Sequence, residues 1–448
     1  MDKNEVIREL LSLYEGDHWD ALDSHFEEMA IQDIAEAISE LDSSDAKRLL
    51  LRLPRDRQPP AFAYVSPELQ EELLEELEEQ DGRFILFHML PDDRTALLER
   101  QDPDDLQRLL RLLSPENVKE ALRLLGFPEE SAGRIMTPKF LTVRVGWTVE
   151  QALDHVRNRS EAGETINVVF VTDVRGALLG RVRLQDFVLG RPDRRIEEVM
   201  RGDPVKILVS EDREEAARLM KHYDLEVLPV VDDTGVMLGI VTIDDVIDVV
   251  EEEATEDFHK MASVGAFNYS LREARPSLLY RKRVGWLVLL VFANVFGGTA
   301  IAYFEETIEA VVALVFFLPL IVDSGGNAGS QSATLMVRAL ATGDVRTKDW
   351  LRLWGKELGV ALALGITMGL AVSVLGIWRG GMDLAMIVSL AMVCVVVMGS
   401  MIGMLLPFVL TRFNLDPAAA SAPLITSIAD FFGILIYFSI ATAFLTLP

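Results

Sequence analysis

The last third of the chain contains five long apolar runs, which restrict the fold more than any other feature. A helix needs about 20 predominantly apolar residues to cross the hydrocarbon core of a bilayer. All five runs approach or exceed this length, at residues 284–304, 310–338, 357–378, 385–411 and 423–447. We therefore predict a multidomain membrane protein with a five-helix transmembrane domain over residues 281–448.

One ionisable side chain, Asp430, lies inside the last apolar run. At a rise of about 1.5 Å per residue it would lie about 10 Å along a helix that begins near Pro423. A charge at membrane depth is expensive unless it faces water, a partner or an ion. A buried carboxyl bonded to a neighbouring helix is one interpretation, and we favour an ion pathway lined by Asp430.

The second apolar run has a polar stripe, because Pro319 is followed by polar and small residues. Gly325, Gly326 and Gly329 fall opposite the stripe, where they would let another backbone approach closely. Polar groups at membrane depth must face protein or water. We favour a pore wall, with Asn327 and Thr426 as further ion-binding candidates. Hydrogen bonding between helices is the alternative interpretation of the stripe. On helical spacing one face collects Asp323, Asn327, Ser330, Gln331, Thr334 and Arg338.

Lysine and arginine gather on one side of the predicted membrane domain. Only Arg379 lies on the other side. The positive-inside rule then places residues 1–283 in the cytoplasm and the C-terminus outside, in a multi-pass protein of the inner (plasma) membrane. The cytoplasmic set comprises Arg281, Lys282, Arg283, Arg338, Arg346, Lys348, Arg352, Lys356 and Arg412.

The acidity of the chain belongs to its first 283 residues, which hold 60 of the 70 acidic and 36 of the 43 basic side chains. This balance argues against nucleic acid as a partner and suits a protein that meets cations. The single cysteine, Cys394, excludes a disulfide framework and fits a reducing cytosol. We expect no enzyme, because no glycine-rich phosphate loop, nucleophile with a base, or His/Cys cluster is present.

Residues 1–127 are predicted to form an acidic, all-helical domain, because their apolar residues recur with a period near 3.6. Proline follows a capping residue at Ser66-Pro67, Asp102-Pro103 and Ser114-Pro115, and opens Pro91-Asp92, as expected for first turns of helices. Stacked short helices, as in a right-handed solenoid, are the expected architecture.

Residues 128–250 contain an internal repeat, with copies over about 136–199 and 200–250. Met136 and Met200 start equivalent segments 64 positions apart, whereas Gly180 and Gly239 match at an offset of 59, so the first copy holds a five-residue insertion near SEAGET. Each copy predicts a strand, a helix, two strands around a glycine turn and a closing helix.

This repeat resembles a cystathionine-β-synthase (CBS) domain pair. CBS pairs bind adenine nucleotides between their copies, with a Ser/Thr-x-x-Asp pattern that holds ribose. The resemblance implies that Asp186, Thr242 and Asp245 could hold ATP, although the first copy lacks the Thr.

An acidic segment from Asp244 to Lys260 follows and overlaps the predicted acidic connecting (plug) helix over residues 251–280. Like charges at helical spacing repel by about 0.2–0.5 kcal/mol per pair. A divalent cation would offset this repulsion, with Mg²⁺ favoured and Ca²⁺ not excluded; a merely soluble connector is the alternative.

The full chain resembles the MgtE-type magnesium channels, most specifically in Pro319 with DSGGNAGSQSATLMVRALATGD and in PLITSIAD with Gly433. The resemblance implies a homodimer with its pore on the two-fold axis, where Asp430 of both subunits holds hydrated Mg²⁺. Some relatives have Asn-Pro where this chain has Ala422-Pro423, so one candidate pore-mouth ligand is missing.

The resemblance also implies gating by cytosolic Mg²⁺, which would bridge acidic residues, hold the soluble parts together and close the pore. The implied regulatory positions are Asp92, Asp212, Glu214, Asp224, Asp245, Asp248, Glu253, Glu256, Asp257 and Asp416.

Two other functions remain open from the sequence. An ion-coupled exchanger is disfavoured, because inverted halves are not evident and one carboxylate leaves little room for a second ion. A membrane-anchored metal or nucleotide sensor without transport would need neither Asp430 nor the polar stripe.

Overall fold

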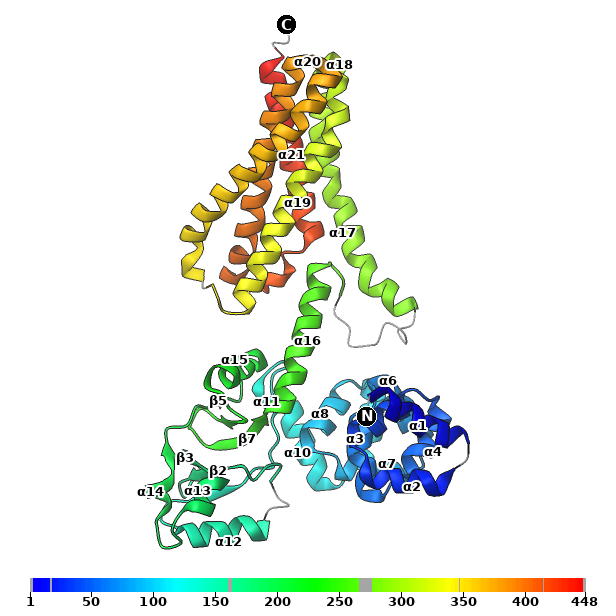
Figure 1. Ribbon diagram of the computed structural model, residues 1–448, viewed down its shortest axis with the longest axis vertical. Helices are drawn as coiled ribbons and strands as arrows, with labels where there is room; N and C mark the ends of the chain where they lie inside the picture. The colour runs from blue at the N-terminus through cyan, green and yellow to red at the C-terminus, as the bar shows by residue number, and fades with distance from the viewer. Residues whose placement is uncertain are drawn as a thin grey trace. The chain divides into compact units, whose positions relative to one another are not determined.

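The computed structural model describes residues 3–16, 18–159, 163–265, 276–345, 347–413 and 415–445. The chain divides into two compact units, residues 1–251 and 252–448 (Figure 1).

The first unit begins with short helices, and no strand occurs in its described residues before 128. Helices pack on their next-but-one neighbours, α1 on α3, α3 on α5, α5 on α7 and α7 on α9. The side chains of Ser66, Asp102 and Ser114 each cap a helix whose first residue is proline, so the predicted helix starts are confirmed. The helices are α1 Lys3–Glu15, α2 Trp19–Glu28, α3 Ile31–Ser39, α4 Ser43–Arg52, α5 Gln58–Ala63, α6 Pro67–Glu76, α7 Glu79–His88, α8 Pro91–Glu99, α9 Pro103–Leu112 and α10 Pro115–Leu125.

The rest of the first unit is the predicted pair of α/β copies. In each, a parallel strand pair continues into an antiparallel hairpin, giving one sheet of order β1-β2-β3-β4 and another of order β5-β6-β7. The elements are α11 Ala132–Ile135, β1 Thr142–Arg144, α12 Val149–Arg159, β2 Val168–Thr172, β3 Leu178–Arg183, α13 Leu184–Leu189, α14 Ile196–Val199, β4 Arg201–Gly202, β5 Ile207–Leu208, α15 Arg213–Tyr223, β6 Val227–Val231, β7 Met237–Thr242 and α16 Ile243–Met261.

The two copies exchange their first segments, which the division at 199/200 does not anticipate. Strand β4, at the start of the second copy, pairs with β3 of the first. Thr137, at the start of the first copy, pairs with Ile240 of the second. The repeated glycine makes room for this exchange: a Cβ on Gly239 would lie 2.8 Å from Sδ of Met136, and one on Gly180 would lie 3.0 Å from Sδ of Met200.

The closing helix of the second copy and the acidic connecting segment are one helix, α16. This helix begins eight residues before the predicted start at 251, because Ile243–Met261 contains no glycine or proline to interrupt it. The prediction of helix up to 280 is not matched, since α16 ends at Met261 and Ser263 adopts a left-handed φ of 56°. Residues 266–275 lie outside the described residues, and α17 begins at Pro276.

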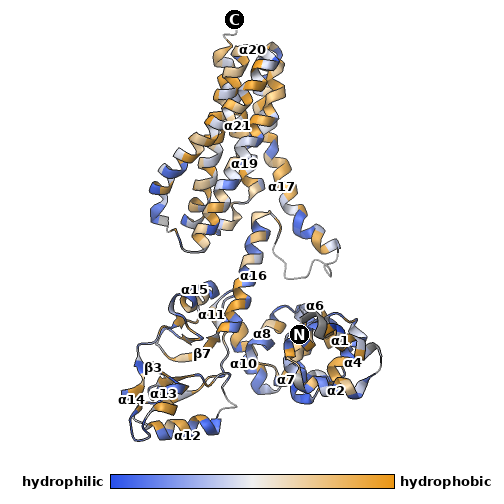
Figure 2. Ribbon diagram, in the orientation of Figure 1, coloured by the Kyte–Doolittle hydropathy of each residue, from blue (hydrophilic) through white to orange (hydrophobic). Residues whose placement is uncertain are grey.

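The second unit contains the apolar helices, shown largely in orange in Figure 2. They are α17 Pro276–Tyr303, α19 Ala313–Ala341, α20 Trp350–Arg412 and α21 Ala422–Phe444, all long and apolar enough to cross a membrane; the short α18, Glu305–Ala310, lies between α17 and α19. Helix α20 breaks at Gly380-Gly381, where Gly381 has a φ of 79°. Its two arms fold back on each other, with Gly365 against Val393 and Gly376 against Ala385. The break therefore yields the five predicted apolar segments.

Glycines bring α19 and the second arm of α20 into backbone contact. A Cβ on Gly399 would lie 2.1 Å from the carbonyl oxygen of Gly325, and one on Gly403 would lie 1.9 Å from that of Gly329. Small residues four apart on both helices permit this approach. The predicted close contact on the glycine face of α19 is confirmed.

Candidate ion-binding sites

The first candidate site is Asp430, which is half-buried on α21. It lies close enough to Asp323 of α19 for their charges to interact. The carboxylate of Asp323 in turn accepts a 2.9 Å hydrogen bond from the side-chain amide of Asn327. Thr426, one turn before Asp430, donates its hydroxyl to the carbonyl of Ala422 and packs on Gly326. The predicted pore residues therefore belong to two helices that pack together.

The polar stripe of α19 is open on a single chain. Asp323, Asn327 and Gln331 are exposed, as are Thr334 and Arg338, whereas the glycines of the opposite face are buried. The sequence-based assignment of the two faces is confirmed. A row of polar groups on an apolar helix requires water or protein in front of it.

The second candidate site is a cluster of three carboxyl groups within the first unit. Oxygen atoms of Asp92, Glu164 and Asp245 all lie within 4.8 Å of one another. Asp92 stands in the first turn of α8, Asp245 stands in the first turn of α16, and Glu164 precedes β2. The side chain of Asp92 is 7% exposed, and one of its oxygens is buried without a hydrogen-bond partner, as is one oxygen of Glu164.

The electrostatics of this cluster favour a bound cation. Burial, followed by the charge of Asp245, raises the pKa of Asp92 well above its usual range. Burial also raises the pKa of Glu164, and raises that of Asp245 to about 7 although Thr242 donates a hydrogen bond to it. Oxygen ligands with this charge suit a hard divalent cation such as Mg²⁺ or Ca²⁺.

Sequence reasoning missed Glu164. A signal was present, because the five-residue insertion in the first repeat lies near this residue. The backbone N–H of Glu164 donates to the carbonyl of Lys139 at 3.0 Å, which fixes the loop beside Thr137. The insertion thus supplies a carboxylate that its counterpart in the second copy does not.

A second acidic cluster lies within residues 252–448, at the end of α16. Lys260 joins Glu256 and Asp416, with both nitrogen–oxygen distances at 2.5 Å. Burial and the nearby charge of Asp416 raise the pKa of Asp257 to about 6. Glu253 adds a further negative charge. Four predicted regulatory residues therefore lie close together here, and the positively charged side chain of Lys260 lies among them.

Comparisons with known proteins match both units. Family models match at residues 318–440 (MgtE, divalent cation transporter), 29–130 (MgtE intracellular N domain), and 132–190 and 196–252 (CBS domain). The magnesium transporter MgtE of Thermus thermophilus is 39% identical over 96% of this chain and 96% of its own length. That of Bacillus subtilis is 32% identical over 93% of this chain and 94% of its own. The chain belongs to the MgtE family.

Membership of a transporter family supports the expectation that the chain is not an enzyme. A solved structure agrees with this membership. The cytosolic domain of the Mg²⁺ channel MgtE, crystallised with ATP, is 38% identical and superimposes with a TM-score of 0.50, covering 53% of this chain and 97% of that one.

Three predicted regulatory residues of this MgtE chain, Asp212, Glu214 and Asp224, lie apart from both clusters, and Asp248 lies beside the first. Asp212 caps α15 by accepting a 2.8 Å hydrogen bond from the N–H of Glu214. Asp224 ends the same helix in a left-handed conformation. Asp248 lies near the α8 side of the first cluster, within electrostatic range of Asp93. The structure therefore assembles seven of the ten predicted positions in or beside two clusters.

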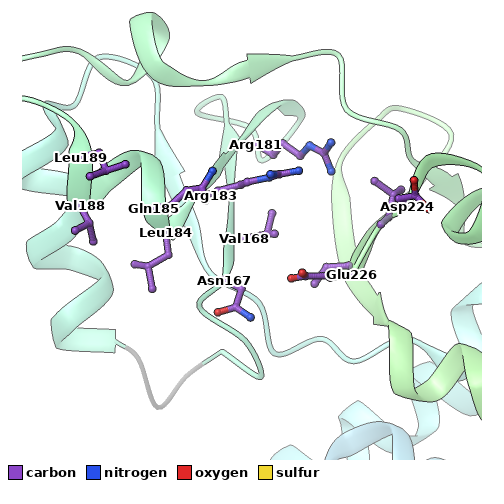
Figure 3. A pocket seen from close by; sticks show the side chains of 12 residues that line it. Asn167, Val168, Arg181, Arg183, Leu184, Gln185, Val188, Leu189, Asp224 and Glu226 are labelled. Carbon is purple, nitrogen blue, oxygen red and sulfur yellow. The ribbon is translucent and has the colours of Figure 1, made fainter.

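A cavity of about 600 Å³ opens between the two CBS copies (Figure 3). Its lining includes Arg181, Arg183 and Gln185 of the first copy, with Asp224 and Glu226 of the second. None of the predicted nucleotide ligands lines it. Asp186 instead caps α13, by accepting from the N–H of Arg183, and Thr242 donates to Asp245 in the acidic cluster. The predicted nucleotide ligands therefore lie outside this cavity.

Proposed function

We propose that this chain is a magnesium channel that admits Mg²⁺ to the cell and closes when cytosolic Mg²⁺ is high. The observation that carries the proposal is Asp430, a carboxylate at membrane depth that faces the polar side of α19. Hydrated Mg²⁺ gives up its waters reluctantly, so it is bound through carboxylates and water rather than in a closed protein cage. Asp430, with Asp323 nearby on α19, provides this kind of weak, exchangeable contact.

The pore is completed by a second copy of the chain. On one chain the stripe from Asp323 to Arg338 is exposed, and the hydrocarbon of a bilayer cannot satisfy it. In a homodimer with Asp430 of both subunits facing the axis, the two stripes enclose a polar path. The Asp430 carboxylates of both subunits then attract a divalent cation, and Asp323 adds negative charge to the path.

Closure is proposed to arise at the two acidic clusters. At low Mg²⁺ their carboxylates repel one another, and at high Mg²⁺ bound cations neutralise them and favour the assembled state. The distribution of Lys and Arg supports cytoplasmic N-terminal domains, an outside C-terminus and residence in the inner (plasma) membrane.

The test is Mg²⁺ entry into proteoliposomes, read by an internal dye, with the cytosolic face held at low or high Mg²⁺. Wild type should conduct at low Mg²⁺ and stop at high Mg²⁺, whereas Asp430→Asn should lose most of the flux at low Mg²⁺. Asp383→Asn, an exposed carboxylate beyond the α20 break, is the matched control and should conduct normally. No flux from folded wild type would favour the sensor, and flux that requires a counter-ion would favour the exchanger.

A second candidate function is nucleotide binding in the CBS cavity, favoured by its arginines. Arg181 and Arg201 are directly opposite on β3 and β4, where like charges are destabilising. Arg183 adds a third positive charge beside Arg181. Figure 3 shows Arg183 and Glu226 pointing into the cavity from opposite sides. The phosphates of ATP would offset the arginine repulsion, and the aliphatic lining would hold the base.

Calorimetric titration of the full chain with ATP tests this site. Arg181→Gln combined with Arg183→Gln should abolish binding, since each charged hydrogen bond lost costs about tenfold. Arg191→Gln, an exposed arginine outside the cavity, should bind like wild type. Equal binding by the double variant and wild type would exclude the arginines as phosphate ligands.

A further inference from the structure

The end of α16 is tied to the beginning of α21 by a buried hydrogen bond between two serines. The hydroxyl of Ser263 donates to the hydroxyl oxygen of Ser421 at 2.7 Å. Ser263 is 6% exposed and Ser421 is fully buried. Both residues belong to the same compact unit. The bond joins positions 158 residues apart, so local chain geometry does not require it.

Ser263 occupies a backbone position that normally selects glycine. The N–H of Ser263 donates to the carbonyl of Lys260 and that of Val264 donates to the carbonyl of His259, so the chain turns sharply after α16. Ser263 has a φ of 56° in this turn. A helix that ends in this way usually has glycine at the left-handed position, because a side chain there is strained. The hydroxyl of Ser263 therefore has a contact that glycine could not make.

Ser421 stands at the N-cap position of α21 but does not cap it. Serine at this position usually accepts a hydrogen bond from an N–H of the first turn, and the side chain of Ser421 accepts none from that turn. Its oxygen receives the Ser263 hydroxyl instead. Asp430 lies nine residues further along the same helix, about 14 Å away at the usual rise.

Neighbouring contacts support the same junction. Lys260 pairs with Asp416, just before the turn that leads to α21. Met261 packs against a small apolar cluster that includes Ile425 of α21 and Val337 of α19. The last turn of α16 is thus held at the base of both helices that carry the polar pore residues.

We propose that the Ser263–Ser421 pair is a latch that transmits the position of α16 to the pore helix α21. This inference rests on the proposed function, in which cytosolic Mg²⁺ closes the channel. The latched arrangement is the closed one: while the hydroxyls are bonded, the start of α21 cannot move independently of α16. The two serines are positioning residues that touch no ion.

The first test measures the cytosolic Mg²⁺ concentration that halves the flux. Ser263→Gly keeps the left-handed turn and removes only the hydroxyl, so it should raise this concentration about threefold to tenfold, the usual range for one hydrogen bond. Ser421→Ala should give a similar shift. The double variant should shift no further, because both changes remove one interaction. Flux at low Mg²⁺ should stay at the wild-type level. Wild-type closure in Ser263→Gly would overturn the latch.

The second test separates the latch from Mg²⁺ gating. In a Cys394→Ala background, Ser263→Cys with Ser421→Cys should form a disulfide under mild oxidation and stop flux even at low Mg²⁺, with recovery on reduction. Either cysteine alone should conduct normally. Cross-linking, which needs no flux, should be faster at high Mg²⁺. An oxidised pair that conducts fully, or cross-links at a rate independent of Mg²⁺, contradicts the latch. A wild type that fails to conduct or to close contradicts the proposed function instead.

Discussion

The two candidate cation sites are built in opposite ways. The cluster of Asp92, Glu164 and Asp245 converges from three elements, is largely buried and is complete within one chain. Asp430 is a single half-buried carboxylate on one helix, and its polar surroundings are open on one chain. A site that senses an ion must hold it, whereas a site that conducts must also release it. The cluster proposed to sense Mg²⁺ accordingly has three carboxylates in a largely buried position, whereas the proposed pore residue Asp430 is only half-buried.

Removing each site separately tests whether one conducts and the other senses. Asp430→Asn should lower flux by about tenfold or more, since a carboxylate near a divalent charge contributes several kcal/mol. The same variant should keep Mg²⁺-dependent protection of the cytosolic part against proteolysis. Protection lost together with flux would mean that the two sites are not separate.

The converse change is Asp245→Asn, which should keep flux and impair closure. Removing one of three carboxylates should raise the closing Mg²⁺ concentration about tenfold, measured in the proteoliposome assay. Asp186→Asn is the matched control, because Asp186 is the repeat equivalent and likewise caps its helix, by accepting from the N–H of Arg183 at 3.3 Å. Equal shifts in both variants would assign the effect to helix capping.

Much of this arrangement could be predicted from sequence where the signal is local or periodic. Ser114-Pro115 predicts a helix start because both residues act on adjacent backbone, and the stripe from Asp323 to Arg338 follows helical spacing. Glu164 could not be predicted as a partner of Asp92, because 72 residues separate them and only the fold brings them together. The repulsion between Arg181 and Arg201 likewise depends on strand register, which the repeat does not reveal.

Membrane packing should be sensitive where the pore helices touch and tolerant elsewhere. Gly403→Ala should lower the free energy of unfolding by about 1–3 kcal/mol, because its Cβ would overlap the carbonyl of Gly329. Gly359→Ala, on the first arm of α20 with open space around it, should be neutral or slightly stabilising. Thermal unfolding in detergent measures both, and an equal loss would contradict the observed helix contact.

The smallest expected effect is the response of the metal-free protein to pH. Burial raises the pKa of Asp245 to about 7 and that of Asp93 to about 6, against 3.8 for an ordinary aspartate. Between about pH 4 and pH 7 the unfolded chain has lost protons that the folded chain still holds. Stability without divalent cations should therefore fall as pH rises through this range, by about 2–4 °C in Tm per kcal/mol.

Added Mg²⁺ should oppose this fall, because it replaces the protons at the carboxylates. Asp245→Asn should flatten the pH dependence in the metal-free protein, whereas Asp186→Asn should not. A metal-free Tm that rises steadily from pH 4 to pH 7 would show that the cluster is not under electrostatic stress.

The strand exchange between the CBS copies has a consequence for how the chain is made. Residues 136–137 leave the ribosome about a hundred residues before Ile240, their pairing partner, and the first sheet lacks its edge strand until Arg201 and Gly202 follow. The first copy therefore cannot finish folding during its own synthesis, whereas the second copy finds its partner, Thr137, already made. Two identical half-length chains would form the same geometry as a symmetric pair. The copies are therefore better regarded as a fused dimer than as two independently folding domains.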